Sequence, residues 1–240
     1  MAESATRLAK LVIQIPCFNE ADTLAATLAD LPRSVSGVDV VEWLIIDDGS
    51  TDGTADVARA NGVDHVVTHS RNRGLAAAFL TGLEAGLRLG ADVIVNTDAD
   101  NQYVADCIPD LIAPVVAGAA DMVVGERPIA DIDDFSWAKK KLQRLGSRVV
   151  RKFSGTDVAD APSGFRAISR EAALRLQVFG RFSYTMETLV QANAEGLAVV
   201  SVPVRVNPQT RPSRLAKSTF QYLRSSGQTI VRSFALYHPF

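Results

Sequence analysis

The chain has 240 residues, of which 47% are hydrophobic and 22% are charged, and its formal net charge at pH 7 is -2. This length fits one α/β domain or two small ones, and the slightly acidic charge argues against general nucleic-acid binding. The polar first ten residues argue against a signal peptide, and no apolar run reaches the roughly 20 residues that a membrane span requires. Cys17 and Cys107 lack metal-ligand spacing, which favours free thiols in a reducing cytoplasm.

The first half of the chain alternates short β-branched runs with helical patterns. Because such alternation gives a parallel sheet with helices on both faces, we expect an α/β fold with a mostly parallel, Rossmann-like central sheet. The expected strands cover residues 11–15, 43–47, 65–68, 93–97 and 122–126, and the expected helices cover 21–31, 53–62, 75–90 and 107–118. Polar motifs follow four of these strands, at the edge where open parallel sheets bind their ligands.

The alternation stops near residue 130. A cluster of lysines and arginines follows at 139–152, then the segment DAPSGFRAISRE, a helix near 184–196 and a strand near 198–206. Residues 201–240 contain several arginines but no Asp or Glu, so we expect an anionic partner for this half. The last stretch, 216–240, has the pattern of a basic amphipathic helix, which could lie at a bilayer interface or pack on the domain.

The stretch VIVNTDADNQY at residues 93–103 ends an apolar run with two carboxylates, Asp98 and Asp100. Two like charges this close repel each other and lose hydration, so an isolated pair would raise a pKa rather than stabilise the fold. A divalent cation shared by the two carboxylates would remove that cost, since such ions prefer oxygen ligands. The stretch therefore predicts a divalent-cation site at the end of the fourth strand.

The motif DDGSTDGT follows the second expected strand. Its glycines allow a tight turn, and Thr51 or Asp52 can cap the following helix, so a capped turn explains most of the motif. A capped turn does not explain Asp48, a second carboxylate at the rim, which could accept hydrogen bonds from a nucleotide base or ribose. The chain has no G-x-G-x-x-G sequence, which counts against a dinucleotide-binding domain.

Taken together, the chain resembles the family 2 glycosyltransferases of the GT-A fold, through the motifs IPCFNE, IIDDGSTDGT, RNRGLAAAF and NTDADNQY in that order. The later segments DAPSGFRAISRE and SVPVRV resemble one branch, the polyprenyl-phosphate glycosyltransferases such as dolichol-phosphate mannose synthase. The resemblance covers nearly the whole chain and implies a GT-A catalytic domain over residues 1–215. Residues 1–128 would be its nucleotide-sugar-binding half and 129–215 its acceptor half, followed by the basic amphipathic segment at 216–240.

The resemblance also implies a metal and a donor. Asp98-Ala99-Asp100 looks like the family's metal-binding DxD motif, and in the dolichol-phosphate branch the position of Gln102 also reaches the metal. Mg²⁺ or Mn²⁺ held there would neutralise charge on the departing nucleoside diphosphate. PCFNE and RNRG, read alone, also fit simple helix starts. The residues implied to bind a UDP- or GDP-linked sugar are Pro16, Phe18, Asn19, Glu20, Asp48, Asn72, Gly74, Asp98 and Ala99.

On the acceptor side, Arg127 in GERP matches an arginine that the family places near the phosphates, and Asp160 matches an acidic residue near the acceptor. Asp160 would be a general base for a hydroxyl acceptor or an orienting group for an ionised phosphate, and a turn cap is the structural alternative. Glu187 matches a further acidic position, where a salt bridge to an arginine or a catalytic role would fit. The implied catalytic residues are Asp160, Asp100 and Arg127. The implied acceptor-phosphate ligands are Arg127, Ser163, Arg205, Arg211 and Arg214, since guanidinium groups bind phosphate bidentately.

The sequence thus leads to an inverting, metal-dependent glycosyltransferase that moves a sugar from a nucleotide sugar to a polyprenyl phosphate at the cytoplasmic face of a membrane. One alternative keeps the donor but uses a hydroxyl acceptor on a saccharide, protein or small molecule. Another is a catalytically silent nucleotide-binding protein on the same scaffold. The sequence contains no Q-x-x-R-W motif, which disfavours a processive polymer synthase.

Overall fold

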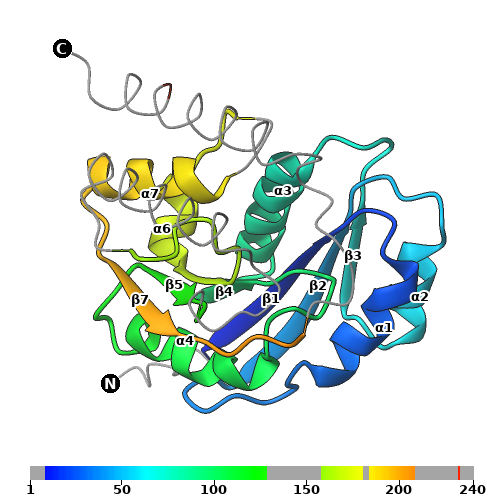
Figure 1. The fold of residues 1–240 in the computed structure, drawn as a ribbon, viewed down its shortest axis with the longest axis horizontal. Helices are drawn as coiled ribbons and strands as arrows, with labels where there is room; N and C mark the ends of the chain where they lie inside the picture. The colour runs from blue at the N-terminus through cyan, green and yellow to red at the C-terminus, as the bar shows by residue number, and fades with distance from the viewer. Residues whose placement is uncertain (1–8, 129–157, 181–183, 209–231, 233–240) are drawn as a thin grey trace, which may run out of the picture.

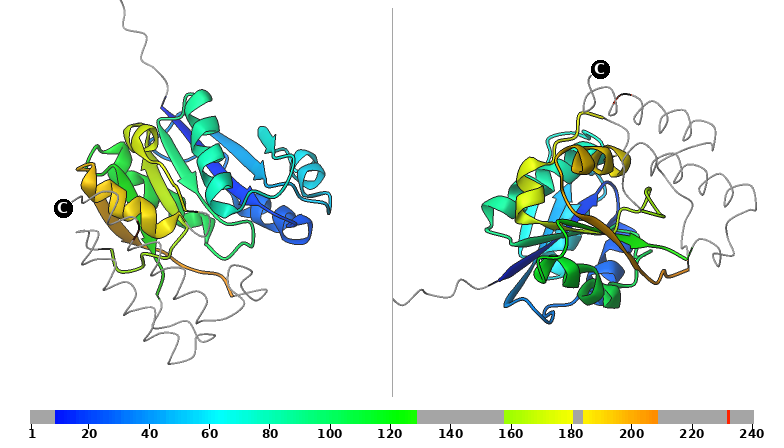
Figure 2. Two further views of the ribbon diagram at one scale, coloured as in Figure 1. Left: turned by 90° about the horizontal axis from the view of Figure 1, so that it is seen from above. Right: turned by 90° about the vertical axis from the view of Figure 1, so that its left-hand side faces the viewer.

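The computed structural model describes residues 9–128, 158–180, 184–208 and 232, and these residues build a seven-stranded sheet (Figure 1). The sheet order is β3-β2-β1-β4-β6-β5-β7, so β3 and β7 form opposite edges (Figure 2). The strands are β1 (Lys10–Cys17), β2 (Val40–Asp47), β3 (His65–Thr68), β4 (Val93–Asn96), β5 (Met122–Glu126), β6 (Arg166–Ser169) and β7 (Val199–Pro203).

Most neighbouring strands run parallel, which confirms the expected sheet. The pairs β1–β2, β1–β4, β2–β3 and β5–β7 are parallel, whereas β6 is antiparallel to both β4 and β5. The expectation drawn from the DAPSGFRAISRE segment did not include this strand. With only four residues, β6 is too short to give a readable alternation, and its place between β4 and β5 is set by pairing rather than by local sequence.

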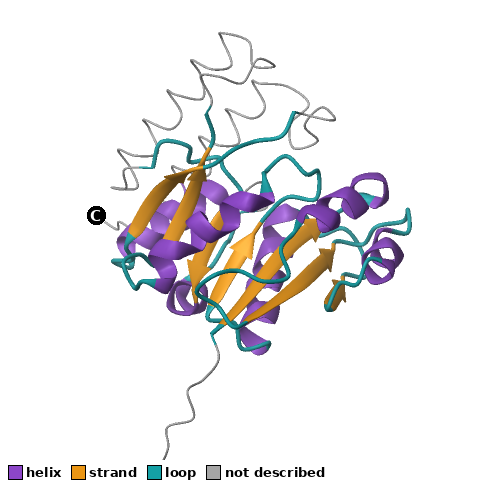
Figure 3. Cartoon of the chain, turned by 90° about the horizontal axis from the view of Figure 1, so that it is seen from below, coloured by secondary structure: helices purple, strands orange, loops and turns teal. Residues whose placement is uncertain are grey.

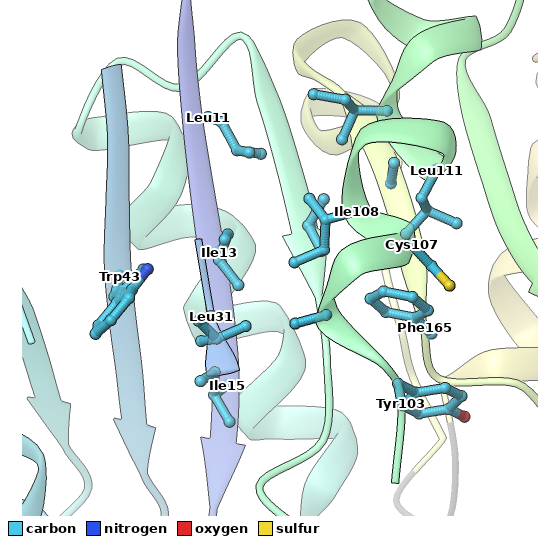
Figure 4. Packing of buried hydrophobic residues seen from close by; sticks show 14 of the residues in the cluster. Leu11, Ile13, Ile15, Leu31, Trp43, Tyr103, Cys107, Ile108, Leu111 and Phe165 are labelled. Carbon is cyan, nitrogen blue, oxygen red and sulfur yellow. The ribbon is translucent and has the colours of Figure 1, made fainter. Parts of the chain in front are cut away.

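The helices cover both faces of the sheet (Figure 3). Along β1 the side chains alternate, so Leu11, Ile13 and Ile15 pack on the face with α1, α2 and α4, where Ile108 lies on the same side (Figure 4). Val12 faces the opposite layer, formed with α3, α6 and α7. The helices are α1 (Ala21–Asp30), α2 (Thr54–Ala60), α3 (Leu75–Arg88), α4 (Ile108–Val116), α6 (Arg170–Arg175) and α7 (Thr185–Ala194), and a 3-10 turn, η1 (Ala105–Cys107), precedes α4.

Several sequence predictions fall outside the described residues. These are the basic cluster at 139–152, the arginines Arg211 and Arg214, and the amphipathic segment at 216–240 apart from Arg232. The division into two halves at residues 128 and 129 also stays a prediction. None of the helices within the described ranges is both long and apolar enough to cross a membrane.

Candidate active site

The carboxyl ends of β1, β2 and β4 meet at one rim. Cys17 at the end of β1 pairs in register with Asp47 at the end of β2, and Gln14 pairs with Asn96 at the end of β4. Because these three strands are parallel neighbours, the motifs PCFNE, DDGST and TDAD leave the sheet side by side. The gathering of polar motifs that the sequence predicts is therefore present.

Two of these loops are tied to each other by the side chains at their tips. Asn19 adopts a left-handed backbone, with φ at 54°, and its N–H donates to Ser50 Oγ over 2.9 Å. Its Oδ1 accepts from the N–H of Thr51 at 2.9 Å. Asp52 accepts from the N–H of Ala21, the first residue of α1, as well as from the N–H of Thr54. The loop after β2 therefore caps two helices, its own and its neighbour's.

Asp48 lies below this rim and is 3% exposed. Its Oδ1 accepts from His69 Nδ1 at 2.6 Å and from the N–H of Arg73 at 2.8 Å. Its Oδ2 accepts from the N–H of Gly74 at 2.8 Å. His69 is held in turn by Thr81 of α3, whose Oγ1 lies 3.0 Å from Nε2. Asp48 thus fixes the backbone of the loop that carries Asn72 and Gly74.

The DAD loop follows β4 and packs against α1. The carbonyl of Ala99 accepts a hydrogen bond from Thr27 Oγ1 at 2.9 Å, which fixes the middle of the motif. Asn101 has a left-handed φ of 54°, and after this reversal the N–H of Gln102 donates to Asp100 Oδ1 at 3.2 Å. Asp98, Asp100 and Gln102 are partly exposed at the rim, where their side chains can reach a ligand.

The segment 160–164 closes over the DAD motif, and Gly164 forms the contact. A Cβ placed on Gly164 would lie 3.2 and 3.4 Å from the carboxylate oxygens of Asp98. The N–H of Gly164 donates to Tyr103 Oη at 3.1 Å, and its carbonyl accepts from Asn96 Nδ2 at 2.9 Å. Asn96 Nδ2 also donates to Tyr184 Oη at 2.9 Å. A buried hydrogen-bond network therefore holds the backbone of this segment against the Asp98 carboxylate of the motif.

Arg127 and Asp160 form a bidentate ion pair beside this contact. Arg127 Nε lies 2.6 Å from Asp160 Oδ2, and Nη2 lies 3.0 Å from Oδ1. The Asp160 side chain is fully buried and that of Arg127 is 10% exposed. Burial acts to lower the pKa of Arg127, but Tyr103 and the Asp160 carboxylate outweigh it and raise the pKa above its usual value. The guanidinium is therefore a fixed positive charge at the rim.

A second buried arginine holds the segment 160–164 from below. Arg166 Nε donates to the carbonyl of Ser163 at 2.9 Å, and Nη2 donates to the carbonyl of Ala161 at 2.8 Å. Nη2 and Nη1 also reach the Thr185 carbonyl and Thr188 Oγ1 of α7. Burial lowers the pKa of Arg166 to about 10, so the group stays charged at neutral pH. Its planar donors pin the segment that carries Asp160 and Gly164.

Comparison with known proteins identifies the family of this chain. The sequence profile of the family described as glycosyl transferase family 2 matches residues 12–176, which is more than half of the chain. The chain belongs to glycosyl transferase family 2. The match includes the DAD motif, Arg127 and Asp160, so the rim described above is the candidate active site of a glycosyltransferase.

Relatives of this glycosyltransferase include enzymes named for polyprenyl phosphates. It is 28% identical over 206 residues to the polyprenol monophosphomannose synthase of Mycolicibacterium smegmatis, covering 81% of this chain and 76% of the relative. It is 30% identical over 200 residues to the undecaprenyl-phosphate mannosyltransferase of Micrococcus luteus, covering 79% and 80%. A dolichyl-phosphate N-acetylglucosaminyltransferase of Methanococcus voltae, which is named for a UDP-N-acetylglucosamine donor, is 30% identical over 213 residues, covering 80% and 83%.

Solved structures support the fold of the glycosyltransferase. The glucosyl-3-phosphoglycerate synthase of Mycobacterium tuberculosis, in complex with Mn²⁺, UDP and glucosyl-3-phosphoglycerate, superposes with a TM-score of 0.72. The alignment covers 95% of this chain and 80% of that one, at 19% identity. At this identity the likeness concerns the fold alone, and it confirms the expected GT-A architecture.

The donor set at the DAD loop of the glycosyltransferase fits a hard divalent cation. Asp98, Asp100 and Gln102 offer carboxylate and amide oxygens, the ligands that Mg²⁺ and Mn²⁺ prefer. Within the described ranges, no three His, Cys, Asp or Glu side chains gather into a complete metal cage. Two carboxylates at an open rim match a site in which phosphate oxygens of the substrate complete the coordination. A Cβ on Gly164 would come within 3.2 Å of a carboxylate oxygen of Asp98, so glycine at this position leaves room for that carboxylate.

The other predicted residues of the glycosyltransferase divide between the rim and its supports. Phe18 lies at the rim and is 41% exposed, whereas Pro16 pairs with Ile46 inside the sheet. Glu20 is almost fully buried, and its Oε2 accepts from Thr23 Oγ1 at 3.0 Å at the start of α1. These positions frame the space above β1 and β2 that the nucleotide is predicted to fill.

The residues predicted to bind the acceptor do not gather at one place among the described residues. Ser163 is fully buried, and its N–H donates to the carbonyl of Asp160 at 3.0 Å. Arg205 is exposed after β7, with its guanidinium 3.5 Å from the carboxylate of Asp106. Glu187 accepts hydrogen bonds from the N–H groups of residues 179 and 180, so within the described residues it supports a loop and pairs with no arginine.

Sequence reasoning missed several supports of the site, among them His69, Arg166 and Tyr184. A histidine after a strand and a tyrosine before a helix carry no local signal of their partners, which come from distant segments. Arg166 offered one signal, because an arginine inside the apolar run GFRAI is unusual unless its donors are satisfied. That signal indicates a buried guanidinium, and the structure shows the carbonyls that it binds.

Proposed function

We propose that this glycosyltransferase moves a sugar from a nucleoside diphosphate sugar, UDP- or GDP-linked, to a polyprenyl phosphate, with inversion at the anomeric carbon. The observation that carries the proposal is the contact of Gly164 with Asp98, because it joins the donor-side motif to the segment that holds the Arg127–Asp160 pair. When the residues that bind the donor contact those that bind the acceptor, the sugar can pass directly from one substrate to the other. The relatives named for polyprenyl phosphates support this class of acceptor.

In this mechanism Asp98, Asp100 and Gln102 would hold Mg²⁺ or Mn²⁺. The bound ion would neutralise charge on the nucleoside diphosphate and so make it a better leaving group. The loops after β1, β2 and β3 bind and orient the nucleotide, with Asp48 holding the last of them in place. Binding by several loops fixes the anomeric carbon in position for attack.

The acceptor attacks through a phosphate oxygen, which forms a bond to the anomeric carbon as the bond from that carbon to the diphosphate breaks. A phosphate monoester is largely ionised near neutral pH, so no general base has to remove a proton. Arg127 supplies positive charge for this anion, and Asp160 orients the guanidinium through both carboxylate oxygens. Because both oxygens of Asp160 already bind Arg127, its geometry fits an orienting group better than a base.

We also propose that the enzyme works at the cytoplasmic face of a membrane, where polyprenyl phosphates reside. The basic amphipathic pattern at 216–240 and the arginines Arg205, Arg211 and Arg214 support this location, since anionic lipid and lipid phosphate both attract such segments. Sedimentation with vesicles that contain anionic lipid tests the proposal. Binding that is equal for neutral and anionic vesicles would contradict it.

The function is tested with Asp100→Ala and a panel of nucleotide sugars, with and without a polyprenyl phosphate. Wild-type protein should transfer sugar only with the lipid phosphate and lose activity on chelation by EDTA. Asp100→Ala should lose transfer and metal-dependent nucleotide binding while it remains folded. Asp110→Ala removes an exposed carboxylate from the first turn of α4 and serves as the matched control. Normal turnover by Asp100→Ala would refute the metal site.

A further inference from the structure

We propose that Asn207 is a positioning residue for the metal-binding loop. Asn207 lies four residues beyond the end of β7, in the segment that runs beside the DAD loop. Its backbone N–H donates to the carbonyl of Gln102 at 2.8 Å, and its side-chain Nδ2 donates to the carbonyl of Asn101 at 2.9 Å. One residue therefore binds two consecutive carbonyls within the span that contains the proposed ligands Asp100 and Gln102. The inference rests on the proposed function of that loop.

The loop requires such support because of its backbone at Asn101. With φ at 54°, Asn101 occupies the left-handed region that residues other than glycine seldom adopt, although asparagine tolerates it better than most. This reversal brings the N–H of Gln102 to 3.2 Å from Asp100 Oδ1. The relative placement of the two proposed ligands therefore depends on the conformation of one residue between them.

Asn101 is held from two sides. Its side-chain Nδ2 donates to Asp30 Oδ2, at the end of α1, over 2.7 Å. Its carbonyl is bound from the other side by Asn207 Nδ2. The pair of contacts fixes both the side chain and the peptide plane of Asn101, and so selects one orientation of the turn.

The backbone around Asn207 already pairs with the loop without its side chain. Tyr103 and Val206 form an antiparallel bridge, and the N–H of Val104 donates to the carbonyl of Arg205 at 3.2 Å. These main-chain bonds survive any substitution at position 207 except proline. The contribution of the side chain, the bond to the Asn101 carbonyl, can therefore be removed alone, and it acts on the turn between the ligands rather than on the pairing.

Partners that orient metal ligands from outside the coordination shell usually contribute about 10–100-fold to metal affinity. We expect Asn207→Ala to raise the dissociation constant for Mn²⁺ about tenfold, measured by the EPR signal of free Mn²⁺ with UDP or GDP present. Asn207→Ser, whose shorter side chain does not reach the Asn101 carbonyl, should behave in the same way. At saturating Mn²⁺ both variants should recover most of the wild-type turnover, because the side chain does not touch the substrate.

The matched control is Asn61→Ala. Asn61 Nδ2 donates to the carbonyl of Val57 at 2.8 Å at the end of α2, so this variant removes the same type of bond away from the loop. It should leave Mn²⁺ binding unchanged, and the free energy of unfolding is measured for all variants. If the wild type binds Mn²⁺ and both Asn207 variants bind it equally well, the inference is wrong and the proposed function stands. If the wild type shows no Mn²⁺ binding with either nucleotide, the proposed function fails, and the inference falls with it.

Discussion

Arg127 and Asp160 face each other through two parallel hydrogen bonds, 2.6 Å from Nε to Oδ2 and 3.0 Å from Nη2 to Oδ1. The residues come from the end of β5 and from the segment before β6, 33 positions apart in the chain. Their pairing joins two sequence motifs that were predicted to serve the acceptor separately. It also separates the two acceptor hypotheses, because a carboxylate that already binds a guanidinium through both oxygens is a poor general base.

The first prediction concerns Asp160→Asn. With a phosphate acceptor, loss of the orienting carboxylate should raise the KM for the acceptor about tenfold, while kcat falls by less than about tenfold. With a hydroxyl acceptor that needs a base, kcat should instead fall by about 10²–10⁴. Steady-state kinetics with the acceptor concentration varied distinguish the two outcomes. Asp110→Asn, which changes an exposed carboxylate in the first turn of α4, is the control and should change neither constant.

The same variant has a consequence for stability. Asp160 is fully buried and Arg127 nearly so, and removal of one partner from a buried pair costs about 3–5 kcal/mol because the other charge is left uncompensated. We expect the lower end of this range for Asp160→Asn, since the amide still offers one oxygen to the guanidinium. Urea unfolding measures the change, and a loss below about 1 kcal/mol would show that water reaches Arg127 and replaces the pair.

The second prediction concerns the position of the Asp98 carboxylate beside Gly164. In Gly164→Ala the new methyl group would meet the Asp98 carboxylate oxygens at 3.2 and 3.4 Å and Tyr184 Oη at 3.0 Å. The backbone of Gly164 is not left-handed, so crowding is the main effect. Asp98 should be displaced by a few tenths of an ångström, and Mn²⁺ affinity should fall about tenfold, as expected for a misplaced ligand.

Gly86→Ala is the control for this crowding. A Cβ at Gly86 would also meet a neighbour closely, Ile94 Cδ1 at 2.8 Å, but that atom is the end of a flexible side chain in the core behind α3. We expect a change in the free energy of unfolding and unchanged Mn²⁺ binding. Equal metal affinities for wild type and Gly164→Ala would mean that Asp98 is not a ligand or can move freely.

The sheet and the rim were largely predictable because both depend on local patterns. Five apolar runs, four of them followed by a polar motif, match β1 to β5 closely, and parallel strands must bring their carboxyl ends together. The antiparallel insertion of β6 was not predictable, because four residues carry almost no alternation and pairing partners are chosen in three dimensions. The GT-A fold was reached through resemblance to a family rather than through these patterns.

The orientation of rim side chains was the harder part. Asp48 was predicted as a nucleotide ligand, which stays a prediction, and the structure shows that its carboxylate accepts hydrogen bonds from His69 and from backbone N–H groups of the next loop. The sequence shows a carboxylate at a strand end, but it does not show whether that carboxylate accepts hydrogen bonds from a ligand or from backbone N–H groups. Arg166 and Asn207 illustrate the same limit, since their partners are carbonyls, which every residue possesses.

The third prediction follows from this role of Asp48. In Asp48→Asn one oxygen becomes an NH₂ group, which faces an N–H donor of residue 73 or 74 and cannot accept from it. We expect the free energy of unfolding to fall by about 1–3 kcal/mol, the cost of a buried donor left unpaired. The loop that carries Asn72 should loosen, so the Kd for UDP or GDP should rise about tenfold, equivalent to about 1.4 kcal/mol.

Thr81→Val is the matched variant for this network. It removes the contact to His69 Nε2 with little change of shape and leaves the Asp48 carboxylate with its three donors. Calorimetric titration should therefore give a Kd within about threefold of the wild type, a difference below about 0.7 kcal/mol. A large loss of nucleotide binding in Thr81→Val, with little in Asp48→Asn, would assign the role to the histidine instead.

The last prediction concerns alkaline pH and Cys17, at the end of β1. Burial, and then the nearby carboxylates of Glu20 and Asp47, raise the pKa of this thiol well above its usual 9.0. Above about pH 9 the unfolded thiol loses its proton while the folded one keeps it, so the folded state binds more protons and loses stability as pH rises. One such group contributes a slope of up to about 1.4 kcal/mol per pH unit.

The slope between about pH 8 and pH 10 is measured by urea unfolding. Cys17→Ala should lower the free energy of unfolding at neutral pH because packing is lost, but it should also flatten this slope. An unchanged slope would show that other groups, such as the buried Tyr103 and Tyr184, cause the loss of stability at alkaline pH.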